Sequence, residues 1–463
     1  MGWYRKMNVY TQLVANIIFP LHERVKKHST VDVRREMEQT QWLKPEQIKA
    51  LQFERLRVFL SDVERHVPYY QQLFKNMGFM PAKLDSMTQL SLLPLLDKAK
   101  IRANSQQLKA NNATALARFN TGGSSGEPLI FYIGNKRVSH DVAAKWRATR
   151  WWGVDIGDPE MVIWGSPIEL GGQDKIKLIR DKLLRTHLLP AFEMSEQKLD
   201  QFIRQIKQLK PKMLFGYPSA LAHIAAHAIK TGQTLNNLGI KVAFVTSERL
   251  YDHQREKIES VFACPVANGY GGRDAGFIAH QCPAGAMHIT AEDIIVEIID
   301  GNGNVLANGE EGEIVVTHLA TRDFPFIRYR TGDVGVLSDE RCSCGRGLPI
   351  LKEIKGRTTD FVVAQDGTVL HGLALIYVLR DLPGVESFKI TQHDLKNTQV
   401  QIVRGEGYCP HNAEAAIVET FKKRLGLGVD IVIDYVTEVA KEKSGKFRYV
   451  VSKVDHDLLN ASA

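Results

Sequence analysis

Residues 121–128 read Thr121-Gly122-Gly123-Ser124-Ser125-Gly126-Glu127-Pro128, and the apolar run Leu129-Ile130-Phe131-Tyr132 follows directly. The three glycines allow backbone conformations and close approaches that a β-carbon would block. Successive amides and hydroxyls in such a turn form a concave site for anions. The proline favours an extended exit, which predicts a strand after it. The stretch therefore indicates either a loop over nucleotide phosphates or a plain surface turn; Glu127 excludes a Walker P-loop, which needs lysine there.

The composition indicates a soluble globular protein that handles anions. The chain has 463 residues, 44% of them hydrophobic and 24% charged, a length that suits two or three domains. Its net charge of +8 favours anionic substrates such as nucleotides and coenzyme A, or a membrane surface. Because the basic residues are spread along the chain, no nucleic-acid partner is expected. The odd number of cysteines, five, favours a reducing cytoplasm with metal ligands or free thiols over disulfides.

The first part of the chain, residues 1–110, is predicted to be helical. The segment 47–67 carries apolar residues at close to a 3.6-residue period. No run reaches the roughly 18 apolar residues that a membrane-spanning helix needs. The apolar run 13–21 has basic residues on both sides. Within residues 1–27 it therefore predicts either a helix packed on its own domain or peripheral association with a membrane surface.

Strand and helix patterns alternate after the glycine-rich stretch, which predicts an α/β fold. Buried strands are expected at 161–164, 213–216 and 241–246. Ser219 is expected to cap the helix 220–230 that follows the second of these strands. Such alternation predicts parallel βαβ units with a site at the carboxyl ends of the strands.

Short strands and turns dominate later in the chain. They predict a β-rich subdomain at about 285–355. A further mixture of strands and helices predicts a small α+β domain at 358–463. The expected organisation is thus a helical region, 1–110, followed by a core at 111–357 that includes the β-rich part, and then the small C-terminal domain.

Five stretches, in their order along the chain, resemble the adenylate-forming enzymes, and among these the branch of phenylacetate–coenzyme A ligases and CapK proteins. They are 121–128, Asn268-Gly269-Tyr270-Gly271-Gly272-Arg273-Asp274, Tyr329-Arg330-Thr331-Gly332-Asp333, Gly356-Arg357-Thr358-Thr359-Asp360 and Lys441-Glu442-Lys443-Ser444-Gly445-Lys446-Phe447-Arg448. The resemblance covers nearly the whole chain. It implies a large N-terminal adenylation domain, built of α/β layers with a β-rich subdomain, and a small mobile C-terminal α+β domain.

The resemblance also implies roles for the first two stretches. The residues that would lie over the ATP phosphates are Thr121, Gly122, Gly123, Ser124, Ser125 and Gly126. Tyr270, with Gly271, would stack on adenine, and Asp274 would hold Mg²⁺, a cation that prefers oxygen ligands. Arg273 departs from the family's hydroxyl residue; its planar fork suits the α-phosphate or the substrate carboxylate. A glycine turn with a surface ion pair is the alternative.

The later stretches resemble the rest of a nucleotide site. Asp333 would accept hydrogen bonds from the ribose hydroxyls, a task that suits a charged acceptor. Ser247 and Glu248 resemble the family's loop beside adenine.

Three positions in or next to the C-terminal domain have roles in the expected mechanism. Arg357 resembles a nucleotide contact at the domain boundary. Lys446 would enter the site and stabilise charge at the α-phosphate. Thr359 stands where family members often carry the aspartate about which the C-terminal domain pivots, and so departs from the family pattern.

Four potential metal ligands occur in two pairs. Cys282 and His288 are followed by Cys342-Ser343-Cys344 in a turn. Three thiolates and one imidazole match a closed structural Zn²⁺ site without a catalytic role, and the set also resembles a zinc-bearing subset of this branch. His280 is the substitute ligand if His288 points away, and ordinary free thiols are the alternative.

The resemblance implies an enzyme that uses ATP to convert a small carboxylic acid to acyl-AMP, with pyrophosphate release, and then transfers the acyl group to coenzyme A. The alternatives are a CapK-like enzyme that uses an amine or hydroxyl as the acceptor in capsular polysaccharide biosynthesis, and a nucleotide-binding scaffold without catalysis. Expected cofactors and cosubstrates are ATP, Mg²⁺, Zn²⁺ and coenzyme A. A cytoplasmic location and a homodimer are further expectations; the carboxylate itself is not predicted.

Overall fold

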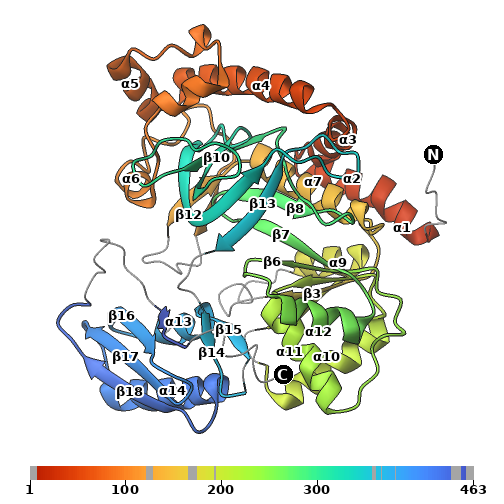
Figure 1. Cartoon of the computed structure of the whole chain (residues 1–463), viewed down its shortest axis with the longest axis vertical. Helices are drawn as coiled ribbons and strands as arrows, with labels where there is room; N and C mark the ends of the chain where they lie inside the picture. Colours follow the sequence, from red (N-terminus) through yellow and green to blue (C-terminus); the bar gives the residue numbers. More distant parts are fainter. Residues whose placement is uncertain are drawn as a thin grey trace.

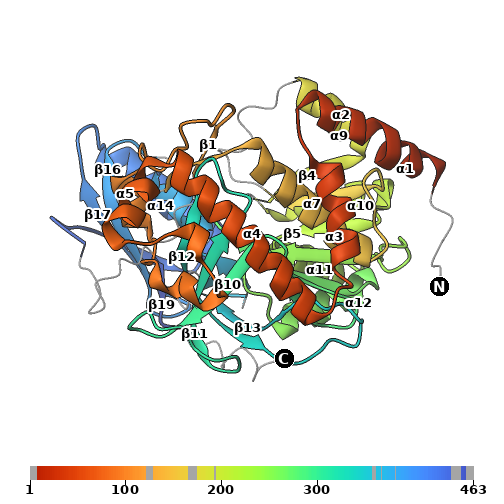
Figure 2. The same cartoon turned by 90° about the horizontal axis from the view of Figure 1, so that it is seen from above.

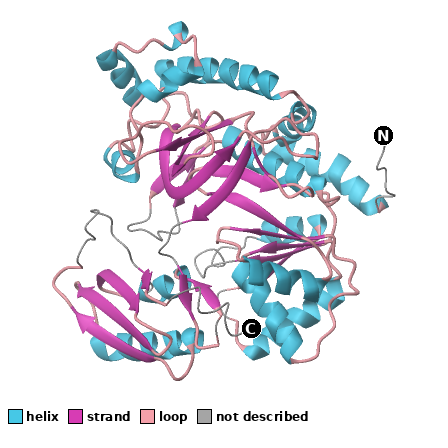
Figure 3. Cartoon of the chain, in the orientation of Figure 1, coloured by secondary structure: helices cyan, strands magenta, loops and turns pink. Residues whose placement is uncertain are grey.

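The computed structural model describes residues 8–120, 129–164, 175–191, 194–356, 361–366, 368–380, 382–439 and 450–454. A large domain surrounds an eleven-stranded sheet, and a small domain, at the lower left of Figure 1, contains a four-stranded sheet. Figure 3 shows helices on both sides of the large sheet. The fold class predicted from the sequence, α/β with a large N-terminal and a small C-terminal domain, is confirmed.

The first part of the chain is a set of helices, as predicted. Their bounds are α1 (Val9–Leu13), the π-helix η1 (Val14–Ile18), α2 (Phe19–Val25), α3 (Thr30–Thr40), α4 (Pro45–His66), α5 (Pro68–Met77), the 3-10 turns η2 (Pro81–Lys83) and η3 (Met87–Leu92), and α6 (Lys98–Ala103). Helix α4 has proline in its first turn, where the missing N–H costs nothing. Its apolar stripe, including Leu56 and Phe59, is fully buried against the large sheet, which α4 crosses in Figure 2.

The strands of the large sheet are β3 (Glu160–Trp164), β4 (Thr186–Pro190), β5 (Met213–Gly216), β6 (Val242–Thr246), β7 (Val266–Gly272), β8 (Gly276–Gln281), β9 (Met287–Ile289), β10 (Ile294–Ile299), β11 (Glu311–His318), β12 (Phe326–Ser338) and β13 (Ile350–Gly356). Their order is β10-β11-β12-β13-β9-β8-β7-β6-β5-β3-β4. From β7 to β4 all neighbours are parallel, which confirms the predicted βαβ units. The strands of the predicted β-rich subdomain at about 285–355, which are β9 to β13, belong to the same sheet.

Helices cover both faces of the parallel strands. They are α7 (Asn135–Trp151), α9 (Lys175–Leu184), α10 (Glu196–Leu209), α11 (Pro218–Lys230) and α12 (Asp252–Phe262). Successive residues of β5 face opposite ways: Leu214 packs with α10, α11 and α12, and Phe215 packs with Ala148 of α7. Because helices cover the sheet on two sides, all five residues of β6 are buried, and the first four are apolar.

The expectation that Ser219 caps α11 is wrong. The helix begins at Pro218, and Tyr217 is the N-cap, without a side-chain capping bond. The fixed φ of proline suits the first helical position, so the helix starts before the serine. The backbone N–H of Ser219 instead donates to a carboxylate oxygen of Glu248 at 3.2 Å.

The small domain comprises β14 (Phe361–Val363), β15 (Val369–His371), α13 (Leu373–Arg380), β16 (Val385–Gln392), β17 (Asn397–Arg404), α14 (Pro410–Leu425), β18 (Asp430–Tyr435) and β19 (Val450–Ser452). Its four-stranded sheet has the order β18-β17-β16-β19. Leu379 of α13 and Phe421 of α14 are fully buried against Ile390 of β16. The domain thus has a hydrophobic core of its own.

None of the helices in the described residues is both long and apolar enough to cross a lipid bilayer.

Candidate functional site

Parallel strands β6 and β7 end at one edge of the sheet. Thr246, the last residue of β6, lies opposite Gly269 of β7, so the loop that begins at Ser247 leaves the sheet opposite the residue before Tyr270. Carboxyl ends of parallel strands are where open α/β sheets form their sites. The predicted residues from two separate motifs therefore meet at this edge.

The loop after β6 carries two signs of a functional site. Ser247 is exposed and has a φ of 71°, in the left-handed region that few residues other than glycine adopt. The next residue, Glu248, accepts the hydrogen bond from Ser219, and burial raises the pKa of its carboxyl to about 7. Unusual backbone conformations and perturbed carboxyl groups are both concentrated at functional sites.

Two hydrogen bonds join β12 to the end of β7 and the turn that follows it. The hydroxyl of Tyr270 donates to Oδ2 of Asp333 at 2.9 Å, and the hydroxyl of Tyr329 donates to Oδ2 of Asp274 at 2.6 Å. Strands β7 and β12 are not neighbours in the sheet, so the sheet curls until their side chains meet. Tyr270, Asp274 and Asp333, which come from two sequence motifs, are thereby brought together.

A buried arginine supports the turn that contains Arg273 and Asp274. Arg137, on α7, is 1% exposed. Its guanidinium donates to the backbone carbonyl oxygens of Arg273, at 3.4 Å, and of Asp274, at 3.3 Å. The Arg273 side chain is exposed at the surface of this turn. Arg137 thus fixes the backbone that presents both predicted catalytic residues.

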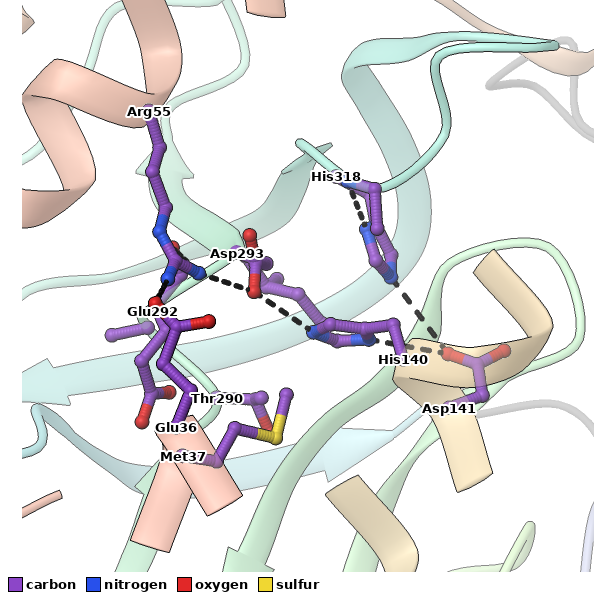
Figure 4. A network of polar contacts seen from close by, with 12 residues as sticks. Glu36, Met37, Arg55, His140, Asp141, Thr290, Glu292, Asp293 and His318 are labelled. Carbon is purple, nitrogen blue, oxygen red and sulfur yellow. Dashed lines mark hydrogen bonds and ion pairs between the residues drawn. The ribbon is translucent and has the colours of Figure 1, made fainter. Parts of the chain in front are cut away.

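Asp141, one helical turn after Arg137, is part of a buried polar network (Figure 4). Nε of Arg137 donates to both carboxylate oxygens, at 3.0 and 2.9 Å. Ring nitrogens of His140 and His318 lie 3.6 and 3.8 Å from Oδ1. Burial opposes the charge, but Arg137 and the two histidines hold the pKa of Asp141 well below its usual range. Although these three side chains bring potential metal-ligand atoms within 4.8 Å of one another, the guanidinium already engages both oxygens, so we assign them to positioning.

The network continues into the N-terminal helices (Figure 4). Nε2 of His140 lies 3.7 Å from Oδ2 of Asp293, and Arg55 of α4 donates to the same oxygen at 2.7 Å. Arg55 also pairs with Glu36 of α3. Helices α3 and α4 are therefore connected, through charged side chains, to the turn that carries Asp274.

Sequence reasoning missed Arg137, Tyr329 and His318. Tyr329 begins the sequence motif that ends with Asp333, so the motif itself could have identified it. Arg137 offered none, because its partners are backbone carbonyls 136 and 137 residues further along the chain.

Several predicted residues lie outside the described ones: Thr121, Gly122, Gly123, Ser124, Ser125, Gly126, Arg357, Thr359 and Lys446. The strands on either side of the glycine-rich stretch, β1 (Ala117–Asn120) and β2 (Ile130–Ile133), pair with Asn120 opposite Ile130. The ring of Phe131 packs edge-on against Phe326 of β12, with centroids 5.8 Å apart. The base of the stretch is therefore anchored to the strand that carries Tyr329 and Asp333.

The four predicted metal ligands form one cluster. Their ligand atoms all lie within 4.8 Å of one another. Sγ of Cys282 is 3.6 Å from Sγ of Cys342, and Nε2 of His288 is 3.2 Å from Sγ of Cys344. Nδ1 of His288 lies 3.2 Å from the carbonyl oxygen of Leu348, which suits an N–H there and leaves Nε2 free to ligate.

His280, the substitute ligand, is not part of this cluster. It lies on β8 opposite His288 and is packed between the rings of Phe244 and Phe277. Burial lowers its pKa to about 3, so the ring is neutral. The structure therefore places the imidazole of His288, and not that of His280, beside the thiols.

Two family models match the chain. The model for AMP-binding enzymes matches residues 185–320, and the model for the CapK C-terminal domain matches residues 362–453. The first match contains Tyr270, Arg273 and Asp274, and the second contains Lys446.

Full-length relatives are similar over most of the chain. Protein CapK of Staphylococcus aureus is 24% identical over 87% of this chain and 89% of its own length. Phenylacetate-coenzyme A ligase of Thermus thermophilus is 25% identical over 73% of this chain and 77% of its own. A crystal structure of 2-hydroxyisobutyryl-CoA ligase in the postadenylation state superposes with a TM-score of 0.60 and 20% identity, over 92% of this chain and 93% of that one.

The contacts of Arg137 predict a local effect of its replacement. Arg137→Lys keeps a cation beside Asp141 but removes the forked contacts to the two carbonyls. We expect amide hydrogen exchange in the segment 270–276 to become about tenfold faster, measured by mass spectrometry. Arg150→Lys, on the same helix but paired with Glu38 and Asp155, is the control and should leave this segment unchanged. Equal exchange in the parent and Arg137→Lys would contradict the role.

The raised pKa of Glu248 predicts a pH dependence of stability. An acid whose pKa is higher in the folded than in the unfolded state destabilises the fold as it ionises, so the cost grows from about pH 4.5 and is complete above pH 7. Glu248→Gln should therefore become more stable than the parent as pH rises, by about 1–3 kcal/mol at pH 8 in urea unfolding. Glu256→Gln, at an exposed carboxyl, is the control. If the free energies of unfolding of the parent and of Glu248→Gln differ by the same amount at about pH 4.5 and at pH 8, the interpretation of Glu248 as a buried acid is refuted.

Proposed function

Because the chain belongs to the adenylate-forming superfamily, in the branch of CapK and the phenylacetate–coenzyme A ligases, we propose that it is an AMP-forming carboxylate ligase. A carboxylate oxygen of a small acid attacks the α-phosphorus of ATP. The bond to the β-phosphate breaks, pyrophosphate leaves and acyl-AMP forms. The thiol of coenzyme A then attacks the acyl carbon, and AMP leaves. The observation that carries this proposal is the meeting of Tyr270, Asp274 and Asp333 beside the base of the glycine-rich stretch.

The nucleotide would be held across the curled sheet. Tyr270, with Gly271 and the loop Ser247-Glu248, offers a surface for adenine, and Asp333 offers a carboxylate to the ribose hydroxyls. The hydrogen bond between Tyr270 and Asp333 supports this proposal, because it sets the aromatic ring and the carboxylate at adjacent positions.

The charge that develops at phosphorus needs cations and amides. Arg273 is the exposed cation nearest to Asp274 in sequence and suits the α-phosphate or the substrate carboxylate. Asp274 accepts from the Tyr329 hydroxyl and from the backbone N–H of Ala275, and its oxygens retain further lone pairs. They therefore fit a Mg²⁺ ion, which would neutralise phosphate charge. The amides of 121–126 and Arg357 complete the nucleotide contacts in this proposal.

The C-terminal domain supplies the lysine of the proposed first half-reaction. Lys446 lies in the segment just before β19, within the part that matches the CapK C-terminal domain. Its ammonium would stabilise the α-phosphate during the attack. Rotation of this domain about a hinge near Thr359 would then move Lys446 out of the site and allow coenzyme A to enter it.

A second candidate differs in the acceptor. The C-terminal domain matches the CapK model, and CapK is similar over more of this chain than the Thermus ligase is. Transfer of the acyl group to an amine or hydroxyl in capsular polysaccharide biosynthesis would use the same adenylation site. Product formation with and without coenzyme A distinguishes the two acceptors.

We also propose that Cys282, His288, Cys342 and Cys344 bind structural zinc. Zinc with Zn–S distances near 2.3 Å holds its sulfur ligands about 3.8 Å apart in a tetrahedron. The observed 3.6 Å between the Cys282 and Cys342 sulfurs fits this geometry. The metal would fasten the loop before β13 to β8 and β9, away from the reacting atoms.

Lys446→Ala tests the adenylation mechanism. We expect carboxylate-dependent pyrophosphate release to fall by about 100-fold or more, because a cation is lost from the charged transition state. Transfer to coenzyme A from added acyl-AMP should be retained. The assay is a panel of aromatic, fatty and amino acids with ATP, with Lys423→Ala, an exposed lysine of the same domain, as the control. Full pyrophosphate release in Lys446→Ala would remove the lysine from the mechanism.

The zinc site predicts a defined metal content. Purified protein should contain about one zinc per chain by elemental analysis, and Cys344→Ser should lose it with a lower melting temperature. Cys409→Ser changes an exposed thiol outside the cluster and should keep the metal. Metal-free protein with all of its cysteines freely titratable would overturn the site.

A further inference from the structure

An exposed apolar stripe runs along the first helices. Val9, Leu13, Ile17, Leu21 and Val25 follow one another at intervals of four residues, and their exposure ranges from 43% for Leu13 to 83% for Val25. Contiguous exposed apolar surface on a soluble chain marks an interaction site more often than an isolated exposed side chain does.

A π-helical turn keeps this stripe on one side. In a regular α-helix, residues four apart drift round the axis, because one turn takes 3.6 residues. The segment Val14–Ile18 is a π-helix, which turns through fewer degrees per residue. The side chains before and after it are therefore returned to the same face.

The opposite face of the same helices is fixed to the large domain. Val14 is fully buried against Gly157. A Cβ added at Gly157 would lie 2.6 Å from the Cβ of Val14. Thr11 donates to a carboxylate oxygen of Asp158 at 2.9 Å, and Phe19 packs edge-on against Trp146. The predicted packing of this segment on its own domain is thus observed for one face, and the other face is presented to solvent.

Helix α9 adjoins the stripe and adds to it. The hydroxyl of Tyr10 donates to the carbonyl oxygen of Leu183 at 2.9 Å, and the Arg185 guanidinium lies over the Tyr10 ring. Ile179 and Leu183 are themselves exposed, at 62% and 43%. Figure 2 shows α1, α2 and α9 together at one end of the molecule.

The charge around this apolar surface is positive. Arg24, Lys26, Lys27 and Lys182 are all exposed. The acidic residues of the described segments 8–27 and 175–184 are Glu23, which is buried, and Asp181, which is paired with Arg180. An apolar face bordered by cations is the pattern of a helix that lies in the interface of an anionic bilayer.

We propose that α1, η1, α2 and α9 form a docking surface for an anionic lipid membrane. The apolar stripe enters the boundary between headgroups and acyl chains, and the lysines and arginines contact the acidic headgroups. Because the opposite face is fixed by Val14 and Phe19, binding orients the whole large domain on the membrane. The surface is separate from the residues assigned to adenylation, so it can be tested without disturbing them.

The test is cosedimentation of the full chain with vesicles. We expect binding to vesicles that contain phosphatidylglycerol and little binding to pure phosphatidylcholine. The double variant Ile17→Glu/Leu21→Glu should weaken binding by about tenfold or more, and Lys26→Gln/Lys182→Gln by severalfold, because apolar insertion and charge both contribute. Ile229→Glu, at an exposed isoleucine of α11, is the matched control and should bind as the parent does.

Melting temperatures of the variants establish that they fold. Absence of binding by the parent, equal binding to both lipids, or equal loss in Ile229→Glu would overturn the proposal. Sedimentation velocity provides a further outcome: a dimer of the parent that the stripe variant dissociates, without vesicle binding, would assign the surface to a second copy of the chain instead.

Discussion

The placement of the candidate site depends on two tyrosine hydroxyls: that of Tyr270 donates to Asp333 of β12, and that of Tyr329 donates to Asp274 in the turn after β7. Hydrogen bonds to charged acceptors contribute about 1.5–3 kcal/mol each, and a buried hydroxyl or carboxylate that loses its partner costs a similar amount. Tyr329 is fully buried, and its ring also packs against Phe326, which supports the hairpin on either side of the glycine-rich stretch. One strand, β12, therefore positions Asp274, Asp333 and the base of that stretch together.

Buried arginines reinforce this arrangement. Arg137 is paired with Asp141, Arg147 with Glu292, and Arg328 with Glu297. Each of these guanidinium groups also donates to backbone carbonyls of other elements. Buried ion pairs add little net stability but are costly to break, so they favour one specific packing of helices on strands. The network in Figure 4 connects the N-terminal helices to Asp141. Arg137 links Asp141 to the turn with Arg273 and Asp274.

Much of this organisation could be predicted from the sequence, because it depends on local patterns of residues. Apolar periodicity predicted α4 and the parallel strands, and motif residues such as Tyr270 and Asp333 proved to be in contact. Cysteine and histidine spacing identified a cluster whose atoms do converge. The curl of the sheet and the role of Arg137 were not accessible, since both depend on contacts between residues far apart in the chain. The start of α11 was misplaced because proline at its first position outweighed the serine.

The N-terminal helices find their partners very late in the chain. Gln52 donates to the carbonyl oxygen of Ala291, and Arg346 donates to Gln41, 305 residues before it. Gln52 lies on α4, 239 residues before Ala291, and at typical rates of synthesis, about 5–20 residues per second, this interval corresponds to roughly 12–48 s. Throughout this time the leucine and phenylalanine side chains of α4 emerge from the ribosome without the strands that will cover them. Exposed apolar side chains on a nascent polypeptide favour chaperone binding, and the long sequence separation of these contacts is of the kind that slows folding.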